Sequence, residues 1–155
     1  MSVAKARKRL MERYHHLYKM YKVKELFKCF YCNMPADTID HCPPLSYVGN
    51  FGVEFLEKNK IPMYKVPCCR ECNSLLGDKM LPTLGERAEY LSDRLFKRYE
   101  IDVQSDLWSD DELDEMGYNM RKFISDSNDV KRISVRRVEY AKATASILLH
   151  NSIKE

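Results

Sequence analysis

All six cysteines of the chain lie between Cys29 and Cys72, and four of them form two pairs with the same spacing. Two residues separate Cys29 from Cys32, and two separate Cys69 from Cys72. This spacing lets a tight turn direct both sulfurs at one ion, and two such turns complete a tetrahedral zinc site. We therefore predict one structural Zn²⁺ bound by these four cysteines. The alternative is that the pairs arise by chance and the thiols are only buried.

The two remaining cysteines leave the ligand set open. Cys68 could replace Cys69, although three residues rather than two would then separate it from Cys72. We favour Cys69 because its spacing matches that of the first pair. Cys42 has no partner by spacing, so it is either a substitute ligand or a small buried apolar residue.

Three further residues suit the cleavage of phosphodiester bonds. Asp40 and His41 stand between the two cysteine pairs, and Asn73 directly follows the last cysteine. Carboxylate and amide oxygens suit a hard cation such as Mg²⁺ or Mn²⁺, which stabilises charge on the phosphorus and on the leaving oxygen. A neutral histidine can take a proton from the attacking water. We predict that His41 is the general base, with an ordinary pKa near ~6.5 if unperturbed, and that Asp40 and Asn73 hold the metal.

The elements around these residues must bring them together, since more than thirty residues separate Asp40 and His41 from Asn73. In a knuckle–hairpin–helix arrangement, zinc fixes the start of the hairpin and the start of the helix. The end of the first strand then faces the beginning of that helix. Neighbouring residues of a regular strand point to opposite faces, so we expect the chain to twist near Pro43 and Pro44.

Each of these residues also has a purely structural interpretation. Asp40 and His41 could cap a turn, and Asn73 could bond its own backbone at the start of the helix. Arg70 could meet a phosphate there or remain a solvated knuckle residue.

Hydrophobic spacing and turn residues predict the remaining elements. We expect a helix over residues 3–27, a knuckle over 28–34, strands over 36–41 and 64–66, a short helix over 53–58, and a helix from about Arg70 to Gly77. In the C-terminal part, we expect helices over 83–100 and from 109 to about 125, followed by a last helix capped by Ser127 or Asn128. Ser109 and Glu112 form a capping box. Apolar stripes mark the N-terminal helix (Leu10, Tyr14, Leu17, Tyr21), the 83–100 helix (Leu84, Ala88, Leu91, Leu95, Tyr99) and the last helix (Val138, Ala141, Ala145, Leu148).

Charge is distributed unevenly along the chain, although its net value is only +3. Residues 1–28 carry nine Lys or Arg and two acidic residues, whereas residues 78–155 carry thirteen and sixteen. A basic arm on a near-neutral body indicates a polyanionic partner. The alternative is a solvated helix face.

Length and composition limit the class of protein. The chain has 155 residues, of which 45% are hydrophobic and 32% charged, which is typical of a small globular protein. Uncharged, mostly apolar runs such as residues 143–149 are far shorter than the ~20 residues of a membrane span. The basic N-terminus lacks the apolar segment of a secretory signal. We therefore expect a cytoplasmic protein without a membrane partner, in which disulfides are rare.

The two cysteine pairs, Asp40-His41-x-Pro43, and Asn73 directly after the last cysteine together resemble the zinc-containing HNH endonucleases. Phage recombination endonucleases of the endonuclease VII type share this pattern. The resemblance covers residues 29–77 and implies an α+β protein with a small ββα-metal core on a treble-clef zinc knuckle. Together with the hydrophobic and charge patterns, it divides the chain into a basic N-terminal helix over 1–28, a nuclease core over 29–80 and a helical region over 81–155. The implied function is a Mg²⁺- or Mn²⁺-dependent DNA endonuclease, in a bacterial or phage-infected cell.

The resemblance has departures and leaves several questions open: the third signature residue is Asn73 rather than histidine, and nothing matches in the two flanking helical parts. Many family members carry an asparagine five residues before the third cysteine, where it orients the catalytic loop, but this chain has Tyr64 there. The resemblance does not distinguish DNA from RNA, branched from linear substrate, nicking from double-strand cleavage, or a monomer from a homodimer. The alternative function is a non-catalytic treble-clef zinc module that binds nucleic acid or a protein. Such a module has no need of Asp40, His41 and Asn73 together.

Overall fold

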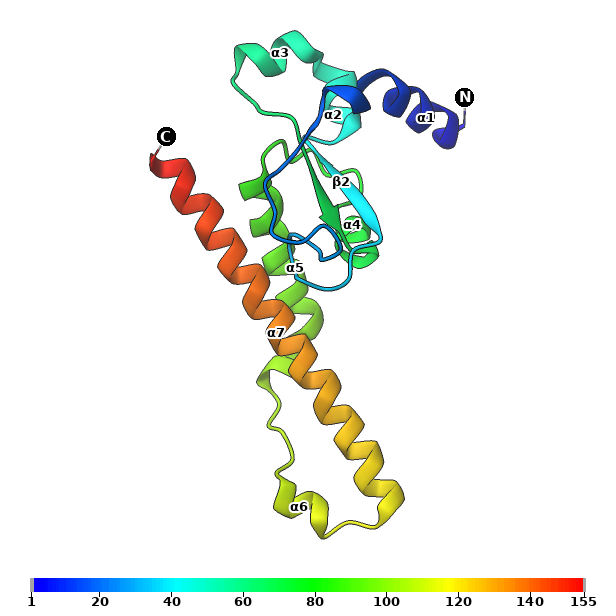
Figure 1. Cartoon of the computed structure of the whole chain (residues 1–155), viewed down its shortest axis with the longest axis vertical. Coiled ribbons are helices and arrows are strands. Elements are labelled where there is room, and N and C mark those ends of the chain that lie inside the picture. Colours follow the sequence, from blue (N-terminus) through cyan, green and yellow to red (C-terminus); the bar gives the residue numbers. More distant parts are fainter. Residues whose placement is uncertain (1, 155) are drawn as a thin grey trace.

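The computed structural model describes residues 2–154, with side chains described for residues 2–151. It is an α+β fold in which a small sheet lies between an N-terminal helical part and a long C-terminal helical hairpin (Figure 1). The elements are α1 (Val3–Tyr14), η1 (His15–Leu17), β1 (Lys19–Met20), β2 (Thr38–Cys42), α2 (Leu45–Phe51), α3 (Val53–Lys58), β3 (Tyr64–Cys68), α4 (Arg70–Leu76), α5 (Leu84–Gln104), α6 (Asp110–Asp114) and α7 (Tyr118–Lys154).

The sheet has the strand order β1-β3-β2. β2 and β3 are antiparallel, and their register pairs Asp40 with Val66 and Thr38 with Cys68. α4 follows β3 directly and ends at Gly77, whose φ of +47° suits a residue without a side chain. These elements agree with the strands and the helix expected from the sequence, apart from shifts of one or two residues at their ends.

The N-terminal helix is shorter than predicted. α1 ends at Tyr14 rather than near residue 27, and the chain then forms a 3₁₀ turn and the two-residue strand β1. The reason is tertiary: β1 runs parallel to β3, with the N–H of Lys19 donating to Met63 and that of Tyr21 donating to Lys65. A helix over the whole segment would leave this edge of β3 unpaired.

The segment between β2 and β3 contains two helices where one was predicted. α3 has the expected bounds, whereas α2 was missed because Gly49 and Gly52 are unfavourable for a helix. α1 packs against α2, and Leu10 lies so close to Gly49 that a Cβ there would meet its side chain at 2.7 Å. Leu10 and Tyr14 of the predicted stripe thus join a separate apolar cluster of the N-terminal part.

The C-terminal hairpin differs from the prediction in its last helices. The capping box of Ser109 and Glu112 is present, but α6 spans only five residues. α7 then begins at Tyr118 and runs for 37 residues. Asn128 therefore caps no helix: its buried amide accepts from the backbone N–H of Trp108 and donates to the Trp108 carbonyl.

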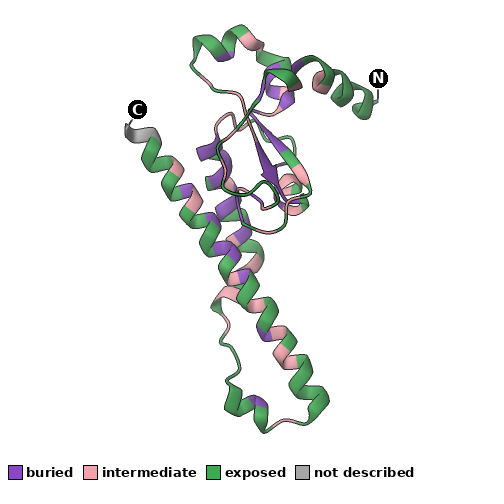
Figure 2. Cartoon of the chain, in the orientation of Figure 1, coloured by how far each residue is buried: buried purple, intermediate pink, exposed green. Residues whose placement is uncertain are grey.

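The main core joins the sheet to the helical hairpin (Figure 2). The predicted stripes of α5 and α7 meet there, with Leu91, Leu95 and Val138 almost fully buried. The other end of the hairpin, around α6, is mostly exposed. Within residues 2–154, none of the helices is both long enough and apolar enough to cross a membrane.

Candidate metal centre and catalytic cleft

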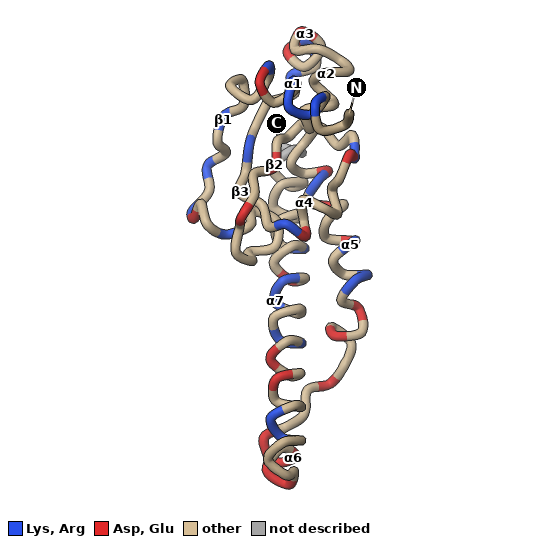
Figure 3. The backbone as a smooth tube through the Cα atoms, turned by 90° about the vertical axis from the view of Figure 1, so that its right-hand side faces the viewer, with Lys and Arg blue, Asp and Glu red and all other residues tan. Residues whose placement is uncertain are grey.

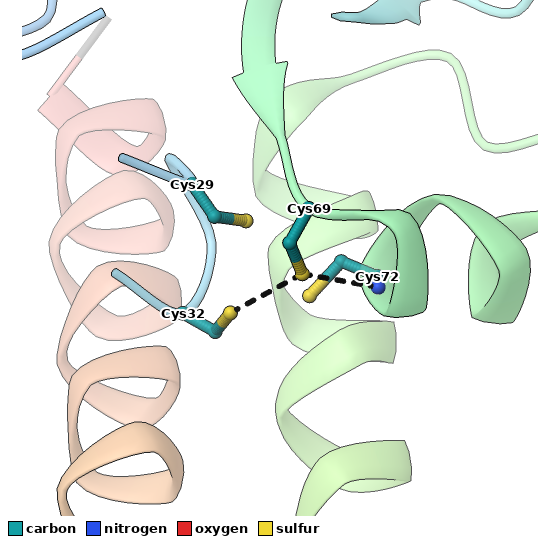
Figure 4. Close-up of side chains that lie close together, drawn as sticks. All are labelled: Cys29, Cys32, Cys69 and Cys72. Carbon is teal, nitrogen blue, oxygen red and sulfur yellow. Dashed lines mark hydrogen bonds between the residues drawn. The ribbon is translucent and has the colours of Figure 1, made fainter. Parts of the chain in front are cut away.

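The four predicted zinc ligands form one buried cluster. The sulfurs of Cys29, Cys32, Cys69 and Cys72 all lie within 4.8 Å of one another. Figure 4 shows that Cys29 and Cys32 come from one loop, and that Cys69 and Cys72 come from the junction of β3 and α4. Four sulfurs gathered from two turns could hold a structural metal such as zinc.

Local backbone geometry explains each turn of the cluster. In the first turn, the N–H of Asn33 donates to the carbonyl of Cys29, and Asn33 has a positive φ of 64°, a conformation that asparagine tolerates well. In the second turn, Cys69 is the N-cap of α4, and its sulfur accepts the N–H of Cys72 at 3.4 Å. The helix start therefore fixes the second pair.

The other two cysteines do not belong to this group of four, although the Cys68 thiol lies close enough to interact with Cys29. The sulfur of Cys68 bonds the carbonyl of Cys69 at 3.4 Å, and the sulfur of Cys42 bonds the carbonyl of Pro82 at 3.3 Å. Burial raises the pKa of the Cys42 thiol above its ordinary value. Cys42 therefore behaves as a small buried residue, and the geometry favours Cys69 over Cys68 as a ligand.

Arg137 connects α7 to the cysteine cluster, a contact that the sequence patterns did not predict. Its Nη2 lies 3.3 Å from the sulfur of Cys69 and 3.9 Å from that of Cys72. Its Nη1 donates to Glu71 and to the hydroxyl of Tyr99. A guanidinium beside several sulfurs compensates the negative charge that thiolate ligands bring to a metal.

A cleft of about 530 Å³ brings the three predicted catalytic residues together. Asp40 and His41 enter from β2 and Asn73 from α4. The cleft lies beside the cysteine cluster because Asn73 directly follows Cys72. The structure thus gathers, at one place, three residues that lie far apart in the sequence.

Asp40 is 3% exposed and forms a buried ion pair with Arg87 of α5. The Nε of Arg87 donates to Oδ2 at 2.9 Å, its Nη2 donates to Oδ1, and the hydroxyl of Tyr31 donates to Oδ2 at 2.6 Å. A carboxylate has about four lone-pair directions. Three of them accept hydrogen bonds, and no further side chain among residues 2–151 bonds the remaining direction at Oδ1. Burial alone would lower the pKa of Arg87, but the Asp40 carboxylate outweighs this and raises it.

His41 follows Asp40 in β2, also lines the cleft and is 9% exposed. Its Nε2 lies 2.8 Å from Nδ1 of His15 in η1. Burial lowers its pKa from 6.5 to about 4; the nearby bases His15, Lys65 and Arg7 contribute in the same direction, whereas Asp40 opposes them. His41 is therefore neutral at pH 7, the form that can accept a proton.

Asn73 does not bond its own backbone through its side chain, as the structural interpretation required. Its Nδ2 donates to Oγ1 of Thr38 at 3.4 Å. This contact turns the amide nitrogen toward the strand. Within the described part of the chain, no hydrogen-bond donor contacts its amide oxygen. This oxygen therefore remains available as a metal ligand.

Arg70 lies away from these residues. It pairs with Asp37 at 3.3 Å and its side chain is 84% exposed, and it does not line the cleft. The geometry therefore favours the solvated interpretation of Arg70. Arg7 is the arginine of the basic arm that reaches the cleft, because α1 forms one of its walls. Figure 3 shows further Lys and Arg residues along α1 and acidic residues gathered at α6.

The contacts of Arg87 and Arg137 have a signal in the sequence. Arg87 lies within the apolar stripe of α5, three residues after Leu84, and Arg137 precedes Val138 in the stripe of α7. A charged residue on a buried helix face needs a partner. His15 has no comparable signal, because its contact depends on where α1 ends.

Comparison with known proteins gives no match to this chain among family models, curated proteins or solved structures.

Proposed function

We propose that the protein is a metal-dependent DNA endonuclease of the HNH type, with a ββα-metal core on a treble-clef zinc knuckle. The observation that supports this best is the single cleft that gathers a buried neutral histidine and two oxygen donors. The cleft is lined by residues of α1, β2, α2 and α4 and by Arg87 of α5, and Asn73 of this lining directly follows Cys72 of the four-cysteine cluster. A purely structural zinc module has no need of such a cleft.

The residues present fit both proposed metals. Four buried sulfurs suit zinc, which would fix the two turns. The remaining lone pair of Asp40 and the unbonded amide oxygen of Asn73 suit Mg²⁺ or Mn²⁺. Such an ion, when bound, supplies positive charge to the phosphate and to the leaving oxygen.

The side chains of the cleft have separate roles in this proposal. His41 takes a proton from the attacking water. Arg87 and Tyr31 hold the Asp40 carboxylate in one orientation through their hydrogen bonds. Arg7, on the wall formed by α1, is placed to contact a phosphate of the substrate.

One observation favours the alternative, a non-catalytic zinc module that binds nucleic acid or a protein. The ion pair between Asp40 and Arg87 would be a sufficient structural reason for a carboxylate at this position. The test is to mix supercoiled plasmid with the zinc-loaded protein, with and without Mg²⁺. The proposed nuclease nicks the plasmid only with Mg²⁺, whereas a binding module retards it on a gel without cutting.

The cleavage rate should stay nearly constant between pH 7.5 and pH 5. Only neutral His41 accepts a proton, and its pKa is lowered to about 4, so almost all of it stays active at pH 5. For an unperturbed histidine with a pKa of ~6.5, the neutral fraction would fall about 30-fold over this range. Single-turnover nicking at constant Mg²⁺ measures this, with zinc content checked at each pH. A fall with its midpoint near 6.5 would show that His41 is solvated.

The basic face of α1 should supply affinity for DNA without reading sequence. Lys5, Lys8 and Arg9 are exposed, so replacing all three by Gln removes charge without disturbing Leu10. DNA binding should weaken, because fewer phosphates are neutralised. The slope of log K against log salt should become shallower by about one for each phosphate that the variant no longer neutralises.

The matched control for this triple variant is Lys97, Lys122 and Arg136 replaced by Gln, since these residues are also exposed but lie on the helical hairpin. The control should keep the wild-type slope. Equal effects of the two triple variants would mean that net charge, rather than the α1 surface, governs binding.

A further inference from the structure

The N-terminal segment fixes the ring of His41 from two sides. His15 contacts it through the 2.8 Å approach of Nδ1 to Nε2, with the ring centroids 5.1 Å apart and the planes at 63°. The ring of Tyr18 lies edge-on, at 4.9 Å and 90°. Tyr18 is itself held because its hydroxyl donates to the carbonyl of Pro43. The rotation of the His41 ring is therefore restricted.

The His15 contact has only two chemical forms when both rings are neutral. A neutral imidazole carries one N–H and one lone pair, so either His41 donates from Nε2 or His15 donates from Nδ1. In the first form, Nδ1 of His41 keeps its lone pair and can accept a proton. In the second form, Nδ1 of His41 carries the hydrogen and the ring cannot act as a base at that atom.

We propose that His15 is a positioning residue that accepts the Nε2–H of His41 and thereby keeps the lone pair of His41 on Nδ1. This inference rests on the proposed nuclease function. A proton of the attacking water moves to Nδ1 of His41 as the water oxygen forms its bond to phosphorus. The bond from phosphorus to the leaving oxygen breaks, and that oxygen takes a proton from solvent. The imidazolium keeps its hydrogen bond to His15.

The burial of the pair supports this division of roles. His41 is buried whereas His15 is only half-buried. His15 can therefore exchange the proton on its Nε2 with solvent while its Nδ1 keeps the hydrogen bond to His41. Arg7, Lys65 and Asp40 also act electrostatically on His41. None of them has a hydrogen bond to its ring among the described contacts. His15 is therefore the group that determines which nitrogen of His41 carries the hydrogen.

The experiment compares zinc-loaded wild type, His15→Ala, His15→Asn and the control His16→Ala, which alters the exposed neighbouring histidine. An asparagine amide oxygen can accept the same N–H as Nδ1 of histidine. The ¹⁵N shifts of the His41 ring report the tautomer without any DNA. Single-turnover cleavage at saturating DNA and the DNA Kd separate catalysis from binding, and thermal melting checks the fold.

We expect wild-type His41 to be protonated at Nε2. His15→Ala should lose this preference and cleave about 10–100-fold more slowly, by analogy with the loss of hydrogen-bond partners of metal-ligating histidines, with an unchanged Kd. His15→Asn should recover part of the rate, and His16→Ala should match wild type. If His15→Ala unfolds, the comparison rests on His15→Asn, which must then keep the Nε2–H tautomer.

The proposal is overturned if wild-type His41 is protonated at Nδ1, or if folded His15→Ala cleaves at the wild-type rate. A wild-type protein that cuts no DNA would instead contradict the proposed function. In that case the ring shifts alone decide whether His15 fixes the tautomer of His41.

Discussion

Replacing Cys29 by serine should remove zinc and unfold the core in one step. The cysteine cluster is continuous with the apolar core that includes Leu76, Leu84 and Leu91. Since β1 has only two residues, the sheet is little more than the hairpin of β2 and β3, and an isolated hairpin is marginally stable at best. Structural zinc contributes roughly 10–16 kcal/mol in small zinc domains, which is as large as the ~5–15 kcal/mol net stability of a whole domain. Loss of one ligand should therefore remove most of the stability.

Metal analysis and circular dichroism of the purified variants measure this. Cys68→Ser is the matched control, since Cys68 is equally buried but does not belong to the group of four sulfurs. The control should keep one zinc per chain. Release of zinc by Cys68→Ser but not by Cys69→Ser would show that the ligand choice is wrong. Wild-type protein that is folded with almost no zinc would contradict the structural role of the metal.

Replacing His41 by alanine should slow DNA cleavage by about 10²–10⁴-fold, the usual contribution of a general base. Zinc content and DNA affinity should stay near wild type, because His41 contacts neither the cysteine cluster nor an exposed basic face. Its ring contacts are with His15 and Tyr18, so only a local loss of packing is expected.

Single-turnover nicking at saturating DNA measures this effect, and His16→Ala again serves as the control. The amide of His41→Gln keeps a hydrogen-bonding group but cannot accept the proton, so it should be as slow as alanine. Cleavage by His41→Ala at the wild-type rate would refute the role of His41 as general base and with it the HNH interpretation of the cleft.

The parts of the structure that depend on neighbouring residues could be predicted from the sequence. The cysteine spacing identified the four sulfurs that cluster, Gly77 identified the end of α4, and Ser109 identified a capped helix start. Each is a local signal, because the two cysteines of each pair, like the residues of each helix end, are close in sequence and one backbone conformation satisfies them.

The parts of the structure that depend on contacts between residues distant in sequence could not be predicted. α1 ends early because β1 pairs with β3, about 45 residues further along. The orientation of Asp40 depends on Arg87, and that of His41 depends on His15. A periodic apolar pattern continues through such a break without marking it, so the helix was expected to run on to residue 27.

Asp40, His41 and Asn73 act as one catalytic cleft in the proposed nuclease, and single-turnover nicking by Asn73→Ala and His41→Ala across a Mn²⁺ titration tests this most directly. A missing metal donor weakens binding of the ion, whereas a missing base cannot be replaced by more metal. Asn73→Ala should therefore need more metal and recover part of its rate at high Mn²⁺, while His41→Ala stays slow at every concentration. Equal rescue of the two variants, or no effect of either, would contradict the proposed catalytic cleft.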